Sequence, residues 1–277
     1  MSGALSVIEA VRRACRESDG QDPLDEATAL RLANHGVGAF EVWLEDDGFA
    51  LGHGTAVDLA VAPTARGRGV GGGLAARAFA GPDPVTAWSH GDHPGAARLA
   101  EVHGLRRARE LWVMRRAGGV PLPSLATPAG VTIRGYRPQD AADVVRVNAA
   151  AFAGHPEQAS MDATELAERM SQGWFDPDGL LLAHDREGVL LGFHWTKRHD
   201  PTTGEVYVVA VSPAAQGTGL GSALTLAGLE HLHAAGVGEV LLYVESDNAP
   251  AIRVYDNLGF GHADADTHVQ YRRGGRA

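Results

Sequence analysis

Val211-Ser212-Pro213-Ala214-Ala215-Gln216-Gly217-Thr218-Gly219-Leu220-Gly221 is the stretch that decides the fold. Residues 205–211 lead into it as a β-branched run with little polarity, which is typical of a strand buried on both faces. An apolar, helix-like run, 220–235, follows the glycines. Glycine lets an anion approach the backbone with no Cβ in the way, and a helix start offers free N–H groups. The stretch therefore predicts an anion-binding loop between a strand and a helix, with a tight turn that holds no ligand as the alternative.

The same arrangement occurs earlier in the chain. Residues 61–71 align with 211–221 without a gap, at an offset of 150, and residues 92–105 align with 247–260 at an offset of 155. Two segments in the same order indicate two copies of one fold. Residues 117–130 hold three prolines, three glycines and no charge, which is typical of a linker. We expect domains at 1–116 and 131–277.

Each copy is predicted to be α/β, with a mixed central sheet flanked by helices. In the second copy, proline at a first helical position predicts a helix from Pro138, and the spacing of Asp162 and Glu165 predicts a capping box. Gly259 is a candidate C-terminal cap. The expected strands are 131–136, 180–183, 189–195, 205–211 and 239–245, and the other expected helices are 220–235 and 249–257.

Composition excludes several classes of protein. A length of 277 residues suits two domains, and a net charge of −10 argues against nucleic-acid binding. No apolar run reaches the roughly 18 residues of a membrane span, and the N-terminus does not resemble a signal peptide because Glu9 interrupts its apolar run. The single cysteine, Cys15, allows no internal disulfide. We expect a cytoplasmic monomer.

A metal site is not expected either. The chain has 13 histidines, but none pairs with a second ligand in a convincing zinc pattern. His262 with Asp264 is a weak candidate, and we reject it.

Three kinds of glycine loop bind phosphate groups of nucleotides. A P-loop ends in Gly-Lys-Ser/Thr, which neither copy has. A Rossmann fingerprint fits Gly67, Gly69 and Gly72, but the second copy has Ser222 at the third position, and several strands precede each loop. The third kind, Arg/Gln-x-x-Gly-x-Gly/Ala, fits both copies, at Arg66, Gly69 and Gly71 and at Gln216, Gly219 and Gly221. Both halves therefore resemble GNAT acetyltransferases, whose loop binds acyl-CoA, and the chain resembles two tandem GNAT domains.

Longer strings resemble one group of tandem GNAT enzymes, the mycothiol synthases of actinobacteria. They are 193–197, 204–209, 213–216 and 242–248, with 155–158, 174–177, 90–94 and 109–112. This resemblance implies transfer of an acetyl group from acetyl-CoA to the cysteinyl amine of desacetylmycothiol, a cysteine–glucosamine–inositol conjugate. A tandem GNAT acting on an aminoglycoside or a protein N-terminus, and a non-catalytic acyl-CoA sensor, remain alternatives.

Acetyl transfer to an amine needs a base, donors for the carbonyl oxygen and an acid for the thiolate. The resemblance implies Glu205 as the base and Tyr255 as the acid. Taken alone, Glu205 could be an exposed strand-end residue and Tyr255 a half-buried packing aromatic. Strand alternation puts Glu205 on the same face as Tyr207 and Val209.

The duplication serves as an internal comparison for these two residues. The ungapped offsets match Glu205 with Thr55 and Tyr255 with Ala100. Neither counterpart can handle a proton in this way, so we expect the first half to be non-catalytic.

The resemblance also implies binding residues. Those for acetyl-CoA are Val209, Ala210, Val211, Gln216, Gly217, Thr218, Gly219, Leu220, Gly221, Ser222, Asn248, Ala251 and Arg253, and in the first half Ala60, Val61, Ala62, Arg68, Gly69, Val70 and Gly71. Those for the acceptor are Glu26, Glu157, Lys197, Glu205 and Tyr243. Glu26 belongs to the first half, so the resemblance implies that both halves contribute to the acceptor site.

Overall fold

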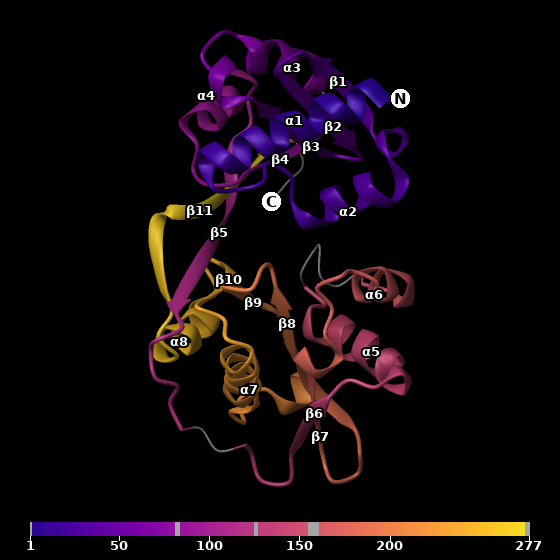
Figure 1. Ribbon diagram of the computed structural model, residues 1–277, viewed down its shortest axis with the longest axis vertical. Coiled ribbons are helices and arrows are strands. Elements are labelled where there is room, and N and C mark those ends of the chain that lie inside the picture. Colours follow the sequence, from indigo (N-terminus) through magenta and orange to yellow (C-terminus); the bar gives the residue numbers. More distant parts are fainter. Residues whose placement is uncertain (1, 81–83, 125–126, 155–160, 275–277) are drawn as a thin grey trace. The chain divides into compact units, whose positions relative to one another are not determined.

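Two compact units make up the computed structural model, which describes residues 2–80, 84–124, 127–154 and 161–274. The first unit comprises residues 1–112, 245–247 and 263–277, and the second comprises 113–244 and 248–262. Each unit is a mixed sheet with helices on both faces (Figure 1). The predicted α/β class is confirmed for both copies.

The first unit begins with an antiparallel meander of three strands, β1 (Glu41–Glu45), β2 (Gly48–His53) and β3 (Ala56–Val61). Strand β4 (Val85–Ser89) is parallel to β3, and β11 (Gly261–Arg273) pairs antiparallel with β4. Apolar side chains from both faces of this sheet are buried under helices. The helices on one face are α1 (Ser2–Asp19) and α2 (Glu26–His35), and those on the other are α3 (Val70–Ala78) and α4 (Pro94–Val102).

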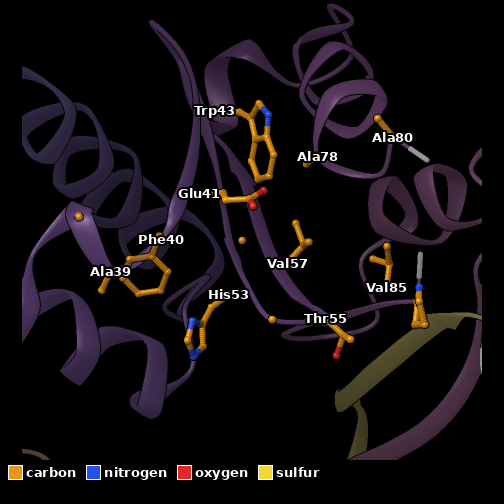
Figure 2. A pocket seen from close by; sticks show the side chains of 14 residues that line it. Ala39, Phe40, Glu41, Trp43, His53, Thr55, Val57, Ala78, Ala80 and Val85 are labelled. Atoms are coloured by element: carbon orange, nitrogen blue, oxygen red, sulfur yellow. The ribbon is translucent and has the colours of Figure 1, made fainter. Parts of the chain in front are cut away.

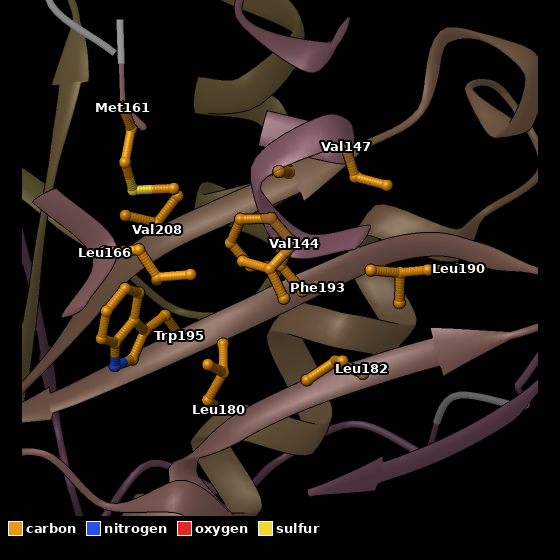
Figure 3. Packing of buried hydrophobic residues seen from close by; sticks show 11 residues of the cluster. Val144, Val147, Met161, Leu166, Leu180, Leu182, Leu190, Phe193, Trp195 and Val208 are labelled. Carbon is orange, nitrogen blue, oxygen red and sulfur yellow. The ribbon is translucent and has the colours of Figure 1, made fainter. Parts of the chain in front are cut away.

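In the second unit, four antiparallel strands precede one parallel strand. They are β6 (Thr132–Gly135), β7 (Leu180–His184), β8 (Leu190–Arg198), β9 (Thr203–Val211) and the parallel β10 (Glu239–Glu245). Helices α5 (Ala141–Ala151) and α6 (Ala163–Met170) cover one face, where Phe193 and Trp195 point from β8 toward Val144 and Leu166 (Figure 3). Helix α7 (Leu220–Ala234) covers the other face, and α8 (Ala249–Asn257) follows β10.

The division of the chain differs from the expected boundaries at 116 and 131. Strand β5 (Arg106–Ala117) begins in the first unit and ends in the second, and the expected linker 117–130 belongs to the second unit. Residues 263–277 belong to the first unit because β11 pairs with β4, from Val269 opposite Ser89 to Arg273 opposite Val85. Such long-range pairing has no local sequence signal, so sequence reasoning alone leads to continuous boundaries.

Local signals gave several element ends correctly. Asp162 caps α6 by accepting from Thr164 N and Glu165 N, and Gly259 follows α8 with a φ of 85°. The Glu165 side chain bonds Arg169 instead of closing a capping box. Pro138 opens a short 3-10 turn, Pro138–Asp140, that leads into α5.

The first unit has a pocket in the region where the second unit has the last turns of helix α7. Helix α3 has 9 residues and its counterpart α7 has 15, so the sheet beyond Ala78 is less covered. A cavity of about 460 Å³ lies there, and its lining includes Phe40, Trp43, His53 and Thr55 (Figure 2). The short helix therefore leaves aromatic side chains of β1 and β2 at the surface of the first unit.

A buried histidine and a glycine fit together under α7. His194 on β8 is fully buried, its Nδ1 lies 2.8 Å from Leu224 O, and burial lowers its pKa to about 4. A Cβ on Gly228 would lie 2.0 Å from the His194 ring. In the first unit, Ala50 corresponds to His194 and Ala78 corresponds to Gly228. Two small side chains there replace the pair of a histidine and a glycine.

We predict that Gly228→Ala lowers the free energy of unfolding of the second unit by about 1–3 kcal/mol, the usual cost of overpacking a core. Urea unfolding measures the change. Gly221→Ala is the matched control on the same helix, because its Cβ would meet Val211 at an ordinary 3.7 Å. Adding His194→Ala to Gly228→Ala should restore part of the loss. An unfolding midpoint that Gly228→Ala leaves unchanged would contradict the fit described above.

Candidate active site

Strand β9 is paired on both sides over its first residues only. Its antiparallel ladder with β8 extends from Gly204 to Val211, whereas its parallel ladder with β10 joins residues 203–206 to 239–242. In the described part of the chain, β8 is therefore the one sheet partner of residues 207–211. Backbone groups at such an edge need other partners, which a ligand can supply. Val209, Ala210 and Val211, which the resemblance implies for acetyl-CoA binding, lie in this stretch.

The glycine loop has the backbone that its sequence predicts. After the 3-10 turn Pro213–Ala215, Gly217 and Gly219 are left-handed, with φ of 76° and 84°, and α7 begins at Leu220. Residues 216–219 are exposed, and a Cβ on Gly217 or Gly219 would meet nothing within 4 Å. The loop thus turns a bare backbone and the start of a 15-residue helix toward open space.

The first unit repeats this loop closely. Gly67 and Gly69 have φ of 75° and 89°. The side chains that open the two loops are anchored alike, since Arg66 Nε donates to Val61 O at 3.2 Å and Gln216 Nε2 donates to Val211 O at 3.3 Å. This equivalence confirms the predicted duplication at the level of individual hydrogen bonds.

A β-bulge distinguishes the second unit from the first. Trp195 pairs with Val208 and the next residue, Thr196, pairs with Val206, so Tyr207 is an extra residue on β9. The ladder between β2 and β3 has no such interruption and ends with His53 opposite Ala56.

The bulge changes the predicted counterpart of Glu205. Glu205 pairs with Lys197, and matching the two ladders residue by residue makes Ala56 its counterpart in the first unit, whereas the ungapped alignment gave Thr55. The prediction was wrong by the one residue of the bulge. Alanine has no titratable group, so the contrast between the two units becomes sharper.

The bulge also sets the face on which Glu205 lies. Lys197, opposite Glu205, has its Nζ 5.1 Å from the Tyr207 ring, on the face covered by α5 and α6. Val209 pairs with His194 and faces α7 instead. Glu205 therefore shares a face with Tyr207, as predicted, but not with Val209. The alternation fails because two successive residues of a bulge point to one side.

Glu205 is buried and hydrogen-bonded, not an exposed strand end. Its exposed fraction is 4%, and its Oε2 lies 2.7 Å from Nε2 of His199. Sequence reasoning missed His199, because this residue follows β8 in a loop and has no periodicity that connects it to Glu205. Only the length of the β8–β9 loop, which returns the chain to the start of β9, could have suggested the contact.

Aromatic rings surround the Lys197 ammonium. Its Nζ lies 5.0 Å from the Trp174 ring and 5.1 Å from the Tyr207 ring, and these two rings are 5.1 Å apart. Cation–π contacts of this kind hold a buried ammonium in place. Arg169 donates to the Tyr207 hydroxyl at 3.0 Å. Sequence reasoning missed Trp174 and Tyr207 as partners of Lys197, although both lie in the strings that carry the resemblance.

Tyr243 lies on the same face as Glu205. It follows Leu241 by two residues, and Leu241 pairs with Glu205 in the parallel ladder, so alternation brings Tyr243 to the Glu205 side. Tyr243 is 43% exposed, which is high for a tyrosine on a central strand. Three of the predicted acceptor residues, Lys197, Glu205 and Tyr243, therefore share one face of the sheet.

Tyr255 is half-buried on α8, and its ring lies 5.8 Å from that of Phe260. Burial raises the pKa of its phenol to about 12, so the hydroxyl is protonated throughout the neutral range. The structure puts Tyr255 and Glu205 on different elements, and within the described chain no hydrogen bond joins them. Its counterpart is Ala100 on α4, since Leu105 N and Phe260 N bond the carbonyls of Ala100 and Tyr255 in turn.

The remaining predicted residues fall into three groups. Glu26 is the first residue of α2 in the first unit and is half-buried, and Glu157 lies outside the described residues. Asn248 caps α8, accepting from Ala251 N at 3.2 Å, and Arg253 is exposed on that helix. The residues of the two loops and of the strands before them lie where the duplication predicts, and they are Ala60, Val61, Ala62, Arg68, Gly69, Val70 and Gly71 with Thr218, Gly221 and Ser222.

The first unit has a buried carboxylate of its own, in a different place. Asp58 on β3 corresponds to Val208, and it accepts from Thr28 Oγ1 at 3.1 Å. Burial, with the nearby Asp25 charge, raises the pKa of Asp58 to about 7. Asp58 is therefore equivalent to Val208 and not to the candidate base, Glu205.

Within the described residues, no group of three or more histidine, cysteine, aspartate or glutamate side chains could hold a metal ion. Nor does that part of the chain contain a helix whose length and apolar character would let it cross a bilayer.

Known proteins share both the fold and the sequence. Residues 146–260 match the model of the Acetyltransferase (GNAT) family. Two solved structures resemble the whole chain, a tandem GNAT protein from the clavulanic acid biosynthesis pathway (TM-score 0.72, 20% identity, covering 100% of this chain and 97% of that one) and a GCN5-related N-acetyltransferase from Sphaerobacter thermophilus (0.69, 23%, 98% and 93%). The chain therefore has the fold of tandem GNAT proteins, and its second unit matches the GNAT family.

Other relatives are more similar to this chain in sequence than those two solved structures are. A mycothiol acetyltransferase of Nocardioides sp. is 58% identical, with 97% of each chain covered, and one of Actinosynnema mirum is 49% identical, with 92% of this chain and 91% of that one covered. The chain belongs to the mycothiol acetyltransferase family.

Proposed function

We propose that this protein transfers the acetyl group of acetyl-CoA to the cysteinyl amine of desacetylmycothiol, the last step of mycothiol biosynthesis, and that the second unit is catalytic. The observation that carries the assignment to the second unit is the bulge at Tyr207. It brings Glu205 into a buried position beside Lys197, where the uninterrupted ladder of the first unit has Ala56. Bulges beside active sites re-aim side chains in this way.

Glu205 acts as the general base in this proposal. An α-amino group has a pKa near 8, so much of the acceptor is protonated at neutral pH and cannot attack a carbonyl. The Glu205 carboxylate accepts that proton, directly or through one water. Lys197, Glu205 and Tyr243 lie on one face and supply the charge and hydrogen bonds that a sugar conjugate needs, with Glu26 and Glu157 added on the strength of the family resemblance.

The loop and strand edge suit acetyl-CoA. The left-handed glycines Gly217 and Gly219 leave open space where a Cβ would stand, which is the room that a pyrophosphate needs beside the backbone. The edge of β9 at Val209–Val211 offers N–H groups to the thioester oxygen, on which charge builds during attack.

Tyr255 donates a hydrogen bond to the departing sulfur of CoA in this proposal. A phenol with a pKa of about 12 keeps its proton at neutral pH and can donate a hydrogen bond. A thiol has an ordinary pKa of about 8.5 and is the stronger acid. Tyr255 therefore stabilises the thiolate by hydrogen bonding, more than by giving its proton up completely.

The first unit is non-catalytic in this proposal, since Ala56 and Ala100 occupy the places of the base and the acid. Its loop has the backbone of a second acetyl-CoA site, and titration calorimetry of acetyl-CoA would count the sites. We also propose that the protein acts in the cytoplasm as a monomer, on a small molecule, with no nucleic-acid or membrane partner.

The purified protein is predicted to release CoA from acetyl-CoA only when an amine acceptor is present. Desacetylmycothiol should be acetylated on nitrogen, and an aminoglycoside or a peptide N-terminus should not. Mass spectrometry is the suitable readout, because both CoA and the acceptor carry thiols. Acetylation of the aminoglycoside or the peptide alone would favour a different amine substrate, and tight acetyl-CoA binding without turnover of any acceptor would favour a sensor. In cells, deletion of the gene should cause desacetylmycothiol to accumulate.

A further inference from the structure

We infer that His199 is a positioning residue, which holds the Glu205 carboxylate so that one of its oxygens faces the acceptor amine. This inference rests on the proposed function, in which Glu205 is the base. Nε2 of His199 lies 2.7 Å from Oε2 of Glu205, within hydrogen-bonding distance. Ionised carboxylates only accept hydrogen bonds, so the Nε2 atom carries the proton of this bond. The second carboxylate oxygen then remains for the amine or a bridging water.

Burial makes such an orienting bond valuable. The Glu205 side chain is 6% exposed and that of His199 is 33% exposed, so the carboxylate is shielded from solvent while the imidazole is partly open to it. A carboxylate in water is held by many solvent contacts, whereas a buried one depends on the few donors around it. His199 is the one hydrogen-bond donor to Glu205 side-chain oxygens among the contacts of the described residues.

The loop that carries His199 is itself well ordered by hydrogen bonds. His199 N donates to Thr203 O at 3.0 Å, which closes the loop between β8 and β9. Asp200 Oδ1 accepts from Thr202 N at 2.7 Å and from Thr203 N at 2.9 Å, and its bonds with Thr202 lower the Asp200 pKa to about 2. These hydrogen bonds hold the backbone of residues 199–203 in one conformation, from which the His199 side chain reaches Glu205.

Lys197 is the partner of Glu205 across the β8–β9 ladder. The Lys197 ammonium is held over the Trp174 and Tyr207 rings, so its position does not depend on His199. Removing the imidazole should thus release the orientation of Glu205 without displacing Lys197. The expected consequence is a loss in kcat with little change in the KM for acetyl-CoA.

Two substitutions separate a donor from a mere space-filler. In His199→Gln the amide can reach the carboxylate as Nε2 does, and we expect it to keep at least about a third of the wild-type kcat. In His199→Leu the donor is lost, and we expect kcat to fall about 10- to 100-fold, the usual effect of removing a group that orients a functional side chain. His233→Leu is the matched control, an exposed histidine near the end of α7 in the same unit. Steady-state kinetics with acetyl-CoA and desacetylmycothiol, and a melting curve for each variant, give the readout.

Wild-type kcat in His199→Leu would overturn the inference, and so would equal losses in the Leu and Gln variants with unchanged melting curves. If His199→Leu does not fold, His199→Ala replaces it under the same expectations. Glu205→Gln is measured alongside. Full activity of that variant would remove Glu205 as the base and defeat the proposed mechanism itself, whereas an inactive Glu205→Gln with a fully active His199→Leu defeats only the role of His199.

Discussion

Glu205→Gln is expected to lower kcat at neutral pH by about 10²–10⁴-fold, the usual contribution of a positioned general base. The amide is nearly the same size and can still accept from His199, so the fold should survive. Part of the loss should return at high pH, because the acceptor amine loses its proton near pH 8 and then needs the base less. A pH–rate profile from about pH 6.5 to 9.5 for both enzymes, which brackets that amine pKa, measures this.

Glu239→Gln is the matched control for that experiment. Glu239 lies on the adjacent strand β10, and its carboxylate forms an ion pair with Arg115 instead of bonding His199. It should stay within a few-fold of wild type at every pH. An unchanged rate in Glu205→Gln at neutral pH would remove this residue from the mechanism, whatever the outcome for the control.

The duplicated loops supply the second test. Gly219→Ala should lower kcat/KM for acetyl-CoA about 100-fold, equivalent to about 2.7 kcal/mol, because the methyl group would occupy the space needed by the pyrophosphate. Gly69→Ala should leave this value nearly unchanged, since its loop belongs to the unit without a base. The two glycines are closely matched, with φ of 84° and 89°, and a Cβ added to either would meet no atom within 4 Å. Both variants therefore carry the same backbone strain.

This match removes the usual ambiguity of a glycine substitution. Alanine in the left-handed region costs roughly 1–2 kcal/mol wherever it occurs. A difference in acetyl-CoA kinetics between two equally strained, folded variants reports the ligand and not the strain. The opposite pattern, with activity lost in Gly69→Ala and kept in Gly219→Ala, would mean that the catalytic unit is assigned wrongly.

Sequence reasoning succeeded where chemistry is local. The left-handed Gly217 and Gly219, the start of α7 and the Asp162 cap all follow from residues within one turn of each other, and the duplication made the loop prediction stronger. The limits of β10 and α8 agree with the expected ranges. These features depend on backbone conformation, which the identity of a few neighbouring residues determines.

Sequence reasoning failed where two distant segments decide the outcome. The bulge at Tyr207 exists only in the pairing of β8 with β9. An ungapped comparison of the two copies could therefore not identify Ala56 as the residue equivalent to Glu205. The bond from His199 likewise depends on how the loop folds back. Lys197 was named as an acceptor residue, but its aromatic surroundings, Trp174 and Tyr207, come from two other elements.

The pairing of β11 with β4 has a consequence for the order in which the chain folds. Residues 269–273 are synthesised after the whole second unit, yet they complete the sheet to which residues 85–89 belong. On the ribosome, the β4 edge of the first unit stays unpaired while the roughly 180 residues that separate Ser89 from Val269 are added, at about 5–20 residues per second. The two copies, although each has its own core, therefore cannot be separated by cutting the chain once, and a gene fragment that ends before β11 encodes an unfinished first unit.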